Sequence, residues 1–140
     1  IPNEQLEAWS VEGAVECWGH RTDMAEILSA STLFCLPSYY GEGVPKVLLE
    51  AAASGRPIIT TDMPGCREVV EDGINGFLVK PRDPEGLTQA IRELLADSNL
   101  RLRMGIASRQ RAEAAFGIEA VTTQTLKLYN ELLQKRQPGI

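Results

Sequence analysis

The sequence predicts an α/β fold in which a parallel sheet carries helices on both faces, and three observations support this fold class. Short apolar runs alternate along the chain with segments whose apolar residues recur at helical spacing. The run at 33–36 is continuously apolar, as in parallel strands that are buried on both sides. The chain has 140 residues, 44% of them hydrophobic and 24% charged, which is the size and composition of one globular domain.

Strands are predicted at four places along the chain: 14–18, 33–36, 57–60 and 76–79. Gly19 breaks the first run, and Pro37-Ser38 stops the second. The third run follows Gly55, which ends a helix, and the turn signals at 72–76 precede the fourth. Because helical segments lie between these runs, we expect the strands to be parallel.

Helices are predicted in the remaining segments: a lead-in at 1–10, a helix from Met24, a helix at 47–53, a short piece at 66–71, and three helices that follow Asp83-Pro84, Asp97-Ser98 and Gly117. Thr22 or Asp23 is expected to cap the helix from Met24. Pro45 suits the first turn of the next long helix, and Asp83 is a cap residue. The apolar stripe of the last helix is expected to belong to the core.

Composition and charge exclude several classes of function. The chain carries 14 basic and 19 acidic residues, a net charge of −5, which argues against a surface for nucleic acid or anionic membrane. No apolar run approaches the roughly 20 residues of a membrane span. Cys17, Cys35 and Cys66 are far apart in sequence and are expected to be reduced core thiols. His20 has no Cys or His neighbour that would indicate a zinc site.

The loops at one end of the predicted sheet are the candidate binding site. Ligands of parallel sheets bind beyond the carboxyl ends of the strands, which selects the loops at 18–23, 37–45 and 60–67. In the loop at 37–45, the backbone N–H groups of Gly43 and Val44 precede a helix. These groups and the positive end of the helix dipole favour a phosphate.

Two acidic residues flank this glycine-rich loop. Glu42 lies just before the helix, and Glu50 lies in its second turn. A carboxylate accepts hydrogen bonds from hydroxyl groups, which a hexose and a ribose both offer. The residues alone leave two interpretations open: Glu42 holds a sugar and Glu50 a ribose, or both are solvated side chains.

A wider set of residues resembles the retaining glycosyltransferases of family four (glycosyl transferases group 1). Glu42, seven intervening residues and Glu50 match the paired-glutamate motif of that family. The resemblance also includes Pro37-Ser38, Gly43, Pro45, Leu49-Glu50-Ala51, Gly55, Pro57, Pro64-Gly65, Glu68, Gly73, Gly76–Val79, Asp83-Pro84, Leu87, Arg103-Met104-Gly105 and Phe116-Gly117. It covers nearly the whole chain.

The resemblance implies a Rossmann-like, carboxyl-terminal donor domain of the GT-B fold, with residues 1–140 as one nucleotide-sugar-binding domain and final helices at 98–136. It implies that Glu42 is the catalytic residue near the donor sugar and that Glu50 binds the ribose. Gly43 and Val44 would face the diphosphate, and His20 and Arg21 would lie near the base. Transfer to a glycan or lipid acceptor would retain anomeric configuration and need neither a metal nor another cofactor.

The chain also departs from the family pattern. It starts after the family's opening strand–helix–strand unit of roughly 30 or more residues, which carries a basic Arg and Lys pair, and it lacks the amino-terminal acceptor domain. We therefore expect a fragment with little or no transferase activity, truncated at its N-terminus. Unpaired sheet edges would make it self-associate, or the lead-in would repair the sheet.

Two alternatives to a transferase stay open at this point. One is a non-catalytic module that binds a nucleotide sugar, and the other is a GT-B relative such as a nucleotide-sugar epimerase. The expected partner is a UDP-, GDP- or ADP-sugar rather than nucleic acid. The expected location is the cytoplasm, or the inner membrane face for a longer protein.

Overall fold

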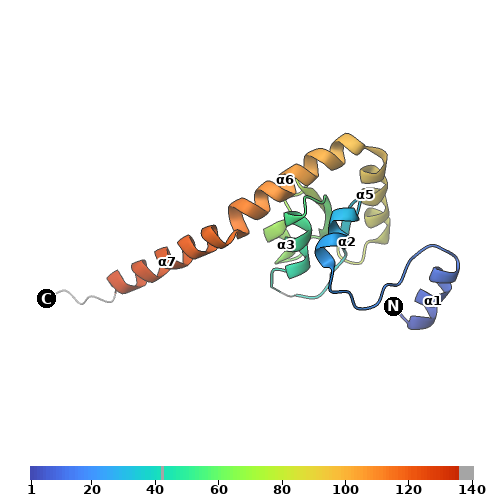
Figure 1. The fold of residues 1–140 in the computed structure, drawn as a ribbon, viewed down its shortest axis with the longest axis horizontal. Helices are drawn as coiled ribbons and strands as arrows, with labels where there is room; N and C mark the ends of the chain where they lie inside the picture. The colour runs from blue at the N-terminus through green and yellow to red at the C-terminus, as the bar shows by residue number, and fades with distance from the viewer. Residues whose placement is uncertain (42, 136–140) are drawn as a thin grey trace.

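The computed structural model describes residues 1–41 and 43–135 (Figure 1). The elements in chain order are α1 (Asn3–Val11), α2 (Met24–Ala30), β1 (Phe34–Leu36), α3 (Lys46–Ala53), β2 (Ile58–Thr61), α4 (Cys66–Val69), β3 (Gly76–Val79), α5 (Pro84–Ala96), α6 (Ser98–Phe116) and α7 (Ile118–Lys135). Three of the four predicted strands are therefore confirmed, each within one residue of its predicted bounds. The predicted helices are present as well.

The strands form one parallel sheet in the order β1-β2-β3. Ile58 of β2 pairs with Phe34 of β1 and with Gly76 of β3, so β2 is the central strand. All four residues of β2 are buried, whereas β1 is only half-buried. The predicted α/β class with a parallel sheet is confirmed.

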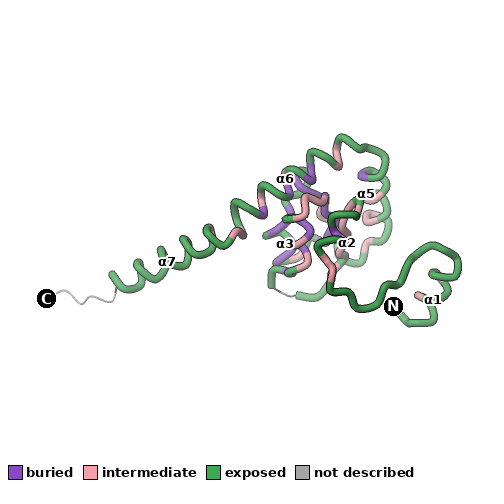
Figure 2. The backbone as a smooth tube through the Cα atoms, viewed as in Figure 1, coloured by how far each residue is buried: buried purple, intermediate pink, exposed green. Residues whose placement is uncertain are grey.

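Helices cover both faces of this sheet. On one face, α2, α3 and α4 pack with the end of α6 around Leu28, Leu48 and Ile58. On the other face, α5 and the start of α6 pack around Ile59 and Leu94. Figure 2 shows that the buried residues gather in the sheet and on the helix sides that face it. The core is thus two apolar layers with the sheet between them.

Two glycines allow backbone segments to come close in this core. A Cβ on Gly105 of α6 would overlap the carbonyl oxygen of Gly55, which lies in the turn before β2. A Cβ on Gly76 would overlap the carbonyl oxygen of Ile58 in the neighbouring strand. The resemblance noted at these two glycines therefore has a steric basis, since only glycine fits such close contacts.

The predicted strand at 14–18 is wrong. These residues are exposed and irregular, and the N–H groups of Ala14 and Val15 bond to the carbonyl oxygen of Trp9 at the end of α1. A strand needs a neighbour to pair with, and among the described residues none lies beside this segment. The lead-in is helical, so it does not repair the sheet as expected above; Figure 1 shows α1 apart from the sheet.

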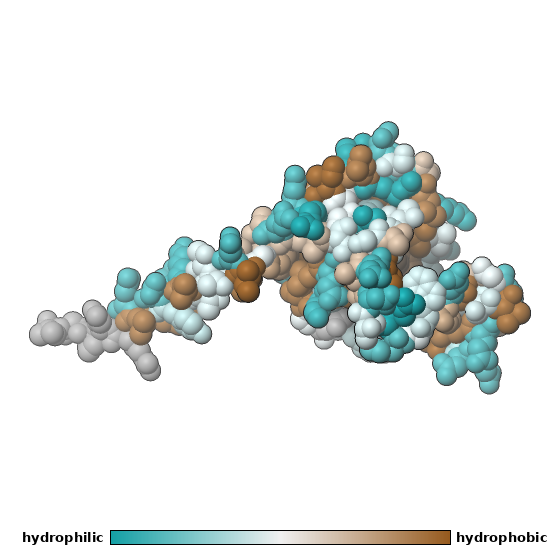
Figure 3. All heavy atoms as spheres, viewed as in Figure 1, coloured by the Kyte–Doolittle hydropathy of each residue, from teal (hydrophilic) through white to brown (hydrophobic). Residues whose placement is uncertain are grey.

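The expectation that the last helix belongs to the core is also wrong. No described residue of α7 is buried, and the helix projects away from the body of the molecule (Figure 1). Its large apolar side chains lie in solvent, among them Ile118, Val121, Leu128, Tyr129, Leu132 and Leu133. Figure 3 shows apolar patches along α7. The periodicity of its apolar residues correctly predicts a helix, but no other element of the described chain covers the apolar face.

Three further expectations have mixed outcomes. Asp83 caps α5 by accepting a hydrogen bond from the N–H of Gly86 at 2.9 Å, as predicted. Asp23 occupies the position before α2, yet its side chain makes no cap hydrogen bond. Cys66 is buried, Cys35 is half-buried, and Cys17 is exposed because the strand predicted around it does not form.

In the described part of the chain, no helix combines the length and apolarity of a membrane span.

Candidate functional site

The carboxyl ends of the three strands meet at one end of the sheet. There, Thr60 Oγ1 donates to the carbonyl oxygen of Leu36 at 2.8 Å, and Thr61 Oγ1 donates to that of Ser38. Both threonines are buried, so these bonds are shielded from water. The bond from Thr61 holds the start of the loop at 37–45 beside the loop at 60–67, and the bond from Thr60 joins β2 to β1. The sequence predicted that these two loops lie at the same end of the sheet. Figure 1 shows the first of these loops at the lower edge of the body.

The loop at 37–45 leads directly into α3. Pro45 is the residue before the helix, and Gly43 and Val44 are exposed ahead of it. A Cβ placed on Gly43 would meet no atom within 4 Å, so the space beside this glycine is open. Glu42, the predicted catalytic residue, lies outside the described residues. The described part of the loop thus presents an accessible backbone at the positive end of the α3 dipole.

Glu50 lies in the second turn of α3, as predicted. Its side chain is 37% exposed, and its Oε1 lies 3.2 Å from Nζ of Lys46, one turn earlier. The Lys46 side chain is 88% exposed, so this ion pair is solvated and weak. The carboxylate is therefore accessible to hydroxyl groups of a ligand.

The predicted base-binding residues lie in the loop before α2. His20 is exposed, and the guanidinium of Arg21 donates to both carboxylate oxygens of Asp23, with Nε 2.7 Å from Oδ1. This hydrogen bonding lowers the pKa of Asp23 and raises that of Arg21. Arg21 also lies 5.8 Å from the ring centre of Trp18. Among described residues, neither His20 nor Arg21 bonds to the loop at 37–45, and their predicted role stays a prediction.

The loop at 60–67 carries an ion pair of its own. Arg67 Nε donates to the carboxylate of Asp62, and its Nη2 lies 3.2 Å from the Asp62 carbonyl oxygen. The hydrogen bond from Arg67 lowers the pKa of Asp62. Arg67 is thereby neutralised by its neighbour rather than left free for an anion.

A further group of residues at this end of the sheet was missed by the sequence reasoning. Tyr39, Thr61, Lys80 and Arg82 line a cavity of about 280 Å³ together with the start of α5. The guanidinium carbon of Arg82 lies 5.1 Å from the Tyr39 ring centre. The rule that selected the other loops also applies to the end of the strand at 76–79, so Lys80 and Arg82 could have been found that way.

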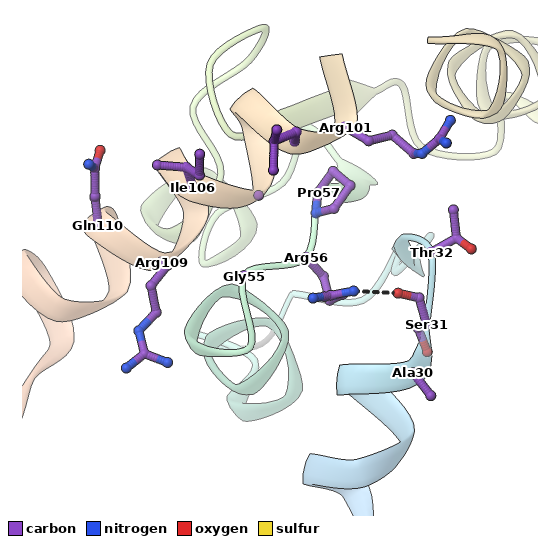
Figure 4. Close-up of a pocket in the computed structure, with 12 residues that line it drawn as sticks. Ala30, Ser31, Thr32, Gly55, Arg56, Pro57, Arg101, Ile106, Arg109 and Gln110 are labelled. Carbon is purple, nitrogen blue, oxygen red and sulfur yellow. Dashed lines mark hydrogen bonds between the residues drawn. The ribbon is translucent and has the colours of Figure 1, made fainter. Parts of the chain in front are cut away.

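A larger cavity, of about 590 Å³, lies at the opposite end of the sheet, between α2, the turn before β2, and α6 (Figure 4). Three arginines line it. Arg56 donates to the Ser31 carbonyl oxygen at 2.7 Å, Arg109 to that of Ala53 at 2.6 Å and Arg101 to that of Leu94 at 2.6 Å. Each arginine thus bonds a carbonyl at or beside a helix C-terminus, and the side chains of Arg101 and Arg109 point apart in Figure 4. These contacts are structural, and they lie far from the carboxyl ends of the strands, where ligands of parallel sheets bind.

No group of three or more His, Cys, Asp or Glu side chains able to hold a metal ion occurs within residues 1–41 and 43–135. The expectation that transfer requires no metal stays a prediction.

Comparisons with known proteins find one family and several related enzymes. The family described as glycosyl transferases group 1 matches residues 2–97. An N-acetylgalactosaminyltransferase of Campylobacter jejuni, named as acting on N,N'-diacetylbacillosaminyl-diphospho-undecaprenol, is 34% identical over 122 residues, which cover 87% of this chain and 32% of the relative. A glycogen synthase of Mycobacterium tuberculosis is 37% identical over 128 residues, 90% of this chain and 31% of the relative.

Solved structures show the same fold. Sucrose-phosphate synthase from Thermosynechococcus elongatus superposes with a TM-score of 0.82 at 30% identity, over 94% of this chain and 33% of the synthase. The Anabaena protein HepE, solved in complex with UDP, superposes with a TM-score of 0.84 at 24% identity, over 91% of this chain and 35% of HepE. The chain thus spans about a third of the length of these relatives.

The expected GT-B relationship is confirmed by these neighbours. The matched range of 2–97 includes α1 to α5, the whole sheet and the loops at the carboxyl ends of its strands. The chain belongs to the family of glycosyl transferases group 1 and corresponds to its carboxyl-terminal domain.

Proposed function

We propose that this chain is the donor-binding part of a retaining glycosyltransferase that moves a hexosyl group from a nucleotide sugar to a glycan or lipid acceptor. The observation that carries the proposal is the combination of an exposed backbone at Gly43 and Val44, just before α3, with the accessible carboxylate of Glu50 in the second turn of that helix. The relatives, which include an N-acetylgalactosaminyltransferase and a glycogen synthase, support the same class of reaction.

In this proposal, each part of the donor meets a group of matching chemistry. The diphosphate lies on the N–H groups at the start of α3, where the helix dipole favours negative charge. The two ribose hydroxyls donate hydrogen bonds to the carboxylate of Glu50. His20 and Arg21 lie near the base. Glu42 acts beside the donor sugar, and no metal takes part.

The proposal includes a limit on the activity of the isolated chain. Because the chain spans about a third of its relatives, the acceptor site is proposed to lie in a separate amino-terminal domain. The chain alone is then expected to bind a donor and to transfer little or none of its sugar. A measured turnover to added acceptor by this chain would contradict that expectation. Function in the cytoplasm is part of the same proposal.

Binding of nucleotide sugars tests the proposal directly. The chain is titrated with UDP-glucose, GDP-mannose and ADP-glucose, by calorimetry and by NMR up to millimolar ligand. We expect binding of at least one of the three, and the preferred base identifies the donor class. Glu50→Ala should weaken that binding, whereas Glu93→Ala, which removes an exposed carboxylate from α5, should leave it unchanged. Absence of binding of all three at millimolar concentration would contradict the proposal.

A further inference from the structure

The loop at 37–45, on which the donor is proposed to lie, is fastened at both of its ends. At its start, the carbonyl oxygen of Ser38 accepts the hydrogen bond from Thr61 Oγ1. At its end, Pro45 leads directly into α3. The stretch between these two points includes the exposed Gly43, whose N–H group is proposed to meet the diphosphate. The affinity for the donor therefore depends on what else restrains this stretch.

Tyr39 gives the middle of this loop a contact with another segment of the chain. The guanidinium carbon of Arg82 lies 5.1 Å from the centre of the Tyr39 ring, within the range of a cation–π contact. The ring centres of Tyr39 and Tyr40 lie 4.2 Å apart, and their hydroxyl oxygens lie 2.8 Å apart. Arg82 thus contacts one member of an aromatic pair in the loop.

The backbone on both sides of Arg82 is fixed by the fold. Before it, the carbonyl oxygen of Val79, at the end of β3, accepts a hydrogen bond from the Asp62 N–H at 2.8 Å. After it, Asp83 caps α5 by accepting from the Gly86 N–H at 2.9 Å. The Arg82 side chain therefore extends from a well-anchored segment, and the aromatic pair in the loop is the part that it can restrain.

Arg82 also has an unfavourable backbone conformation. Its φ is +60°, and among residues 1–41 and 43–135 it is the one non-glycine residue with a positive φ. Glycine and asparagine adopt this conformation more readily than arginine does. Strain of this kind persists where the surrounding structure over-determines a residue, and it concentrates at functional sites. The conformation therefore points to a role for the guanidinium that a residue better suited to this φ would not supply.

We propose that Arg82 is a positioning residue for donor binding, because its guanidinium restrains the Tyr39 ring and, through it, the loop that presents Gly43 and Val44 to the diphosphate. The inference rests on the proposed function. Arg82 acts through Tyr39 and does not itself contact the donor. Both side chains are exposed, so the contact is a weak one. Its loss should weaken donor binding by about two- to fivefold.

Matched variants at two nearby cations test the role of the guanidinium. The probe is whichever of UDP-glucose, GDP-mannose and ADP-glucose the parent chain binds most tightly, titrated by calorimetry. Arg82→Asn tolerates the positive φ but removes the cation, and should weaken binding by about two- to fivefold. Arg82→Lys keeps a cation and should restore most of the affinity. Lys80→Ala removes an exposed cation from the same segment and should leave binding unchanged. An equal loss from Lys80→Ala would indicate general attraction of the donor to positive charge and overturn the inference.

A double-mutant cycle separates action through Tyr39 from direct contact with the donor. Tyr39→Leu removes the ring, whereas Tyr39→Phe keeps it and should bind the probe nearly as the parent does. If Arg82 acts through the ring, the chain with both Arg82→Asn and Tyr39→Leu should bind no more weakly than the chain with Tyr39→Leu alone. Losses that multiply would show that Arg82 reaches the donor independently, and would overturn the positioning role.

Amide exchange in the free chain distinguishes failure of this inference from failure of the proposed function. Arg82→Asn should speed exchange at Tyr40, Gly43 and Val44 and leave exchange in β2 unchanged. A matching increase in β2 would show general destabilisation of the fold and would overturn the inference. If none of the three nucleotide sugars binds the parent chain, the proposed function fails and the positioning role fails with it. If the parent binds through Glu50 while Arg82→Asn changes neither binding nor loop exchange, the positioning role fails alone.

Discussion

Thr61 Oγ1 donates a hydrogen bond to the carbonyl oxygen of Ser38, which fastens the start of the glycine-rich loop to the end of the central strand. Thr61 is 1% exposed, so the bond lies in the interior. Thr60 makes the equivalent bond one step back, to Leu36 within β1. One of these two neighbouring threonines thus holds the binding loop, and the other holds only the sheet.

This difference predicts distinct effects of two isosteric variants. Thr61→Val and Thr60→Val each remove one buried hydrogen bond and should each lower the free energy of unfolding by about 1–2 kcal/mol. Only Thr61→Val should also weaken nucleotide-sugar binding and speed amide exchange in the loop at 37–45. Denaturant unfolding, calorimetry and hydrogen exchange measure the three effects. Equal loss of binding in both variants would show that the Ser38 contact has no special role.

The exposed pair of Lys46 and Glu50 predicts unequal effects of removing its two members. Glu50→Ala should cost about 1–3 kcal/mol of nucleotide-sugar binding, because the ribose hydroxyls lose their acceptor. Lys46→Ala should change binding far less, since the pair is solvated and the lysine is 88% exposed. Calorimetry on both variants tests the ribose assignment. A larger loss from the lysine than from the glutamate would contradict it.

The close approach of Gly105 to the Gly55 carbonyl predicts an unusual response to alanine. Alanine inside a helix normally stabilises by about 1 kcal/mol relative to glycine. Here the added Cβ overlaps the carbonyl oxygen, so Gly105→Ala should destabilise the fold by about 1–3 kcal/mol. Ile106→Ala, at the exposed neighbouring position, should stay within about 0.5 kcal/mol of the parent. Thermal and denaturant unfolding distinguish the two.

The three cysteines should differ in reactivity and in its dependence on pH. Cys17 is exposed, Cys35 half-buried and Cys66 buried, so alkylation should proceed in that order. Burial raises the pKa of the Cys35 thiol, because the fold disfavours its thiolate. The stability from this neutral thiol is present below the ordinary thiol pKa and is lost as pH rises through the raised value. Mass spectrometry of iodoacetamide-treated protein should therefore show Cys35 labelling only at higher pH than Cys17.

The outer edge of β1 predicts association of the chain with itself. The Phe34 N–H donates to the carbonyl oxygen of Pro57, just before β2, at 3.0 Å. The Cys35 N–H therefore points to the other side, where no described strand lies. We expect the mass measured by light scattering to rise with concentration. Cys35→Pro removes that outward donor without breaking the ladder to β2, and should shift the equilibrium towards monomer. A monomeric mass at every concentration would contradict association through this edge.

Local signals in the sequence were enough to predict many of the helices and strands of this protein. The strand Phe34–Leu36 follows from a continuous apolar run that stops at proline, and α5 follows from an aspartate cap before proline. The paired glutamates and the glycines of one loop identified the family. Such features depend on residues near one another in the chain, which is why they can be read without the fold.

Tertiary structure decided the rest. Residues 14–18 have the composition of a strand, but a strand forms only where another strand offers its backbone groups, and here none does. The last helix has the stripe of a core helix, yet only the fold shows that no described element covers it. The contact of Arg82 with the Tyr39 ring joins residues far apart in the sequence, so it too arises only in the fold. The sequence determined which local structures are possible, and packing selected those that form and the site they build.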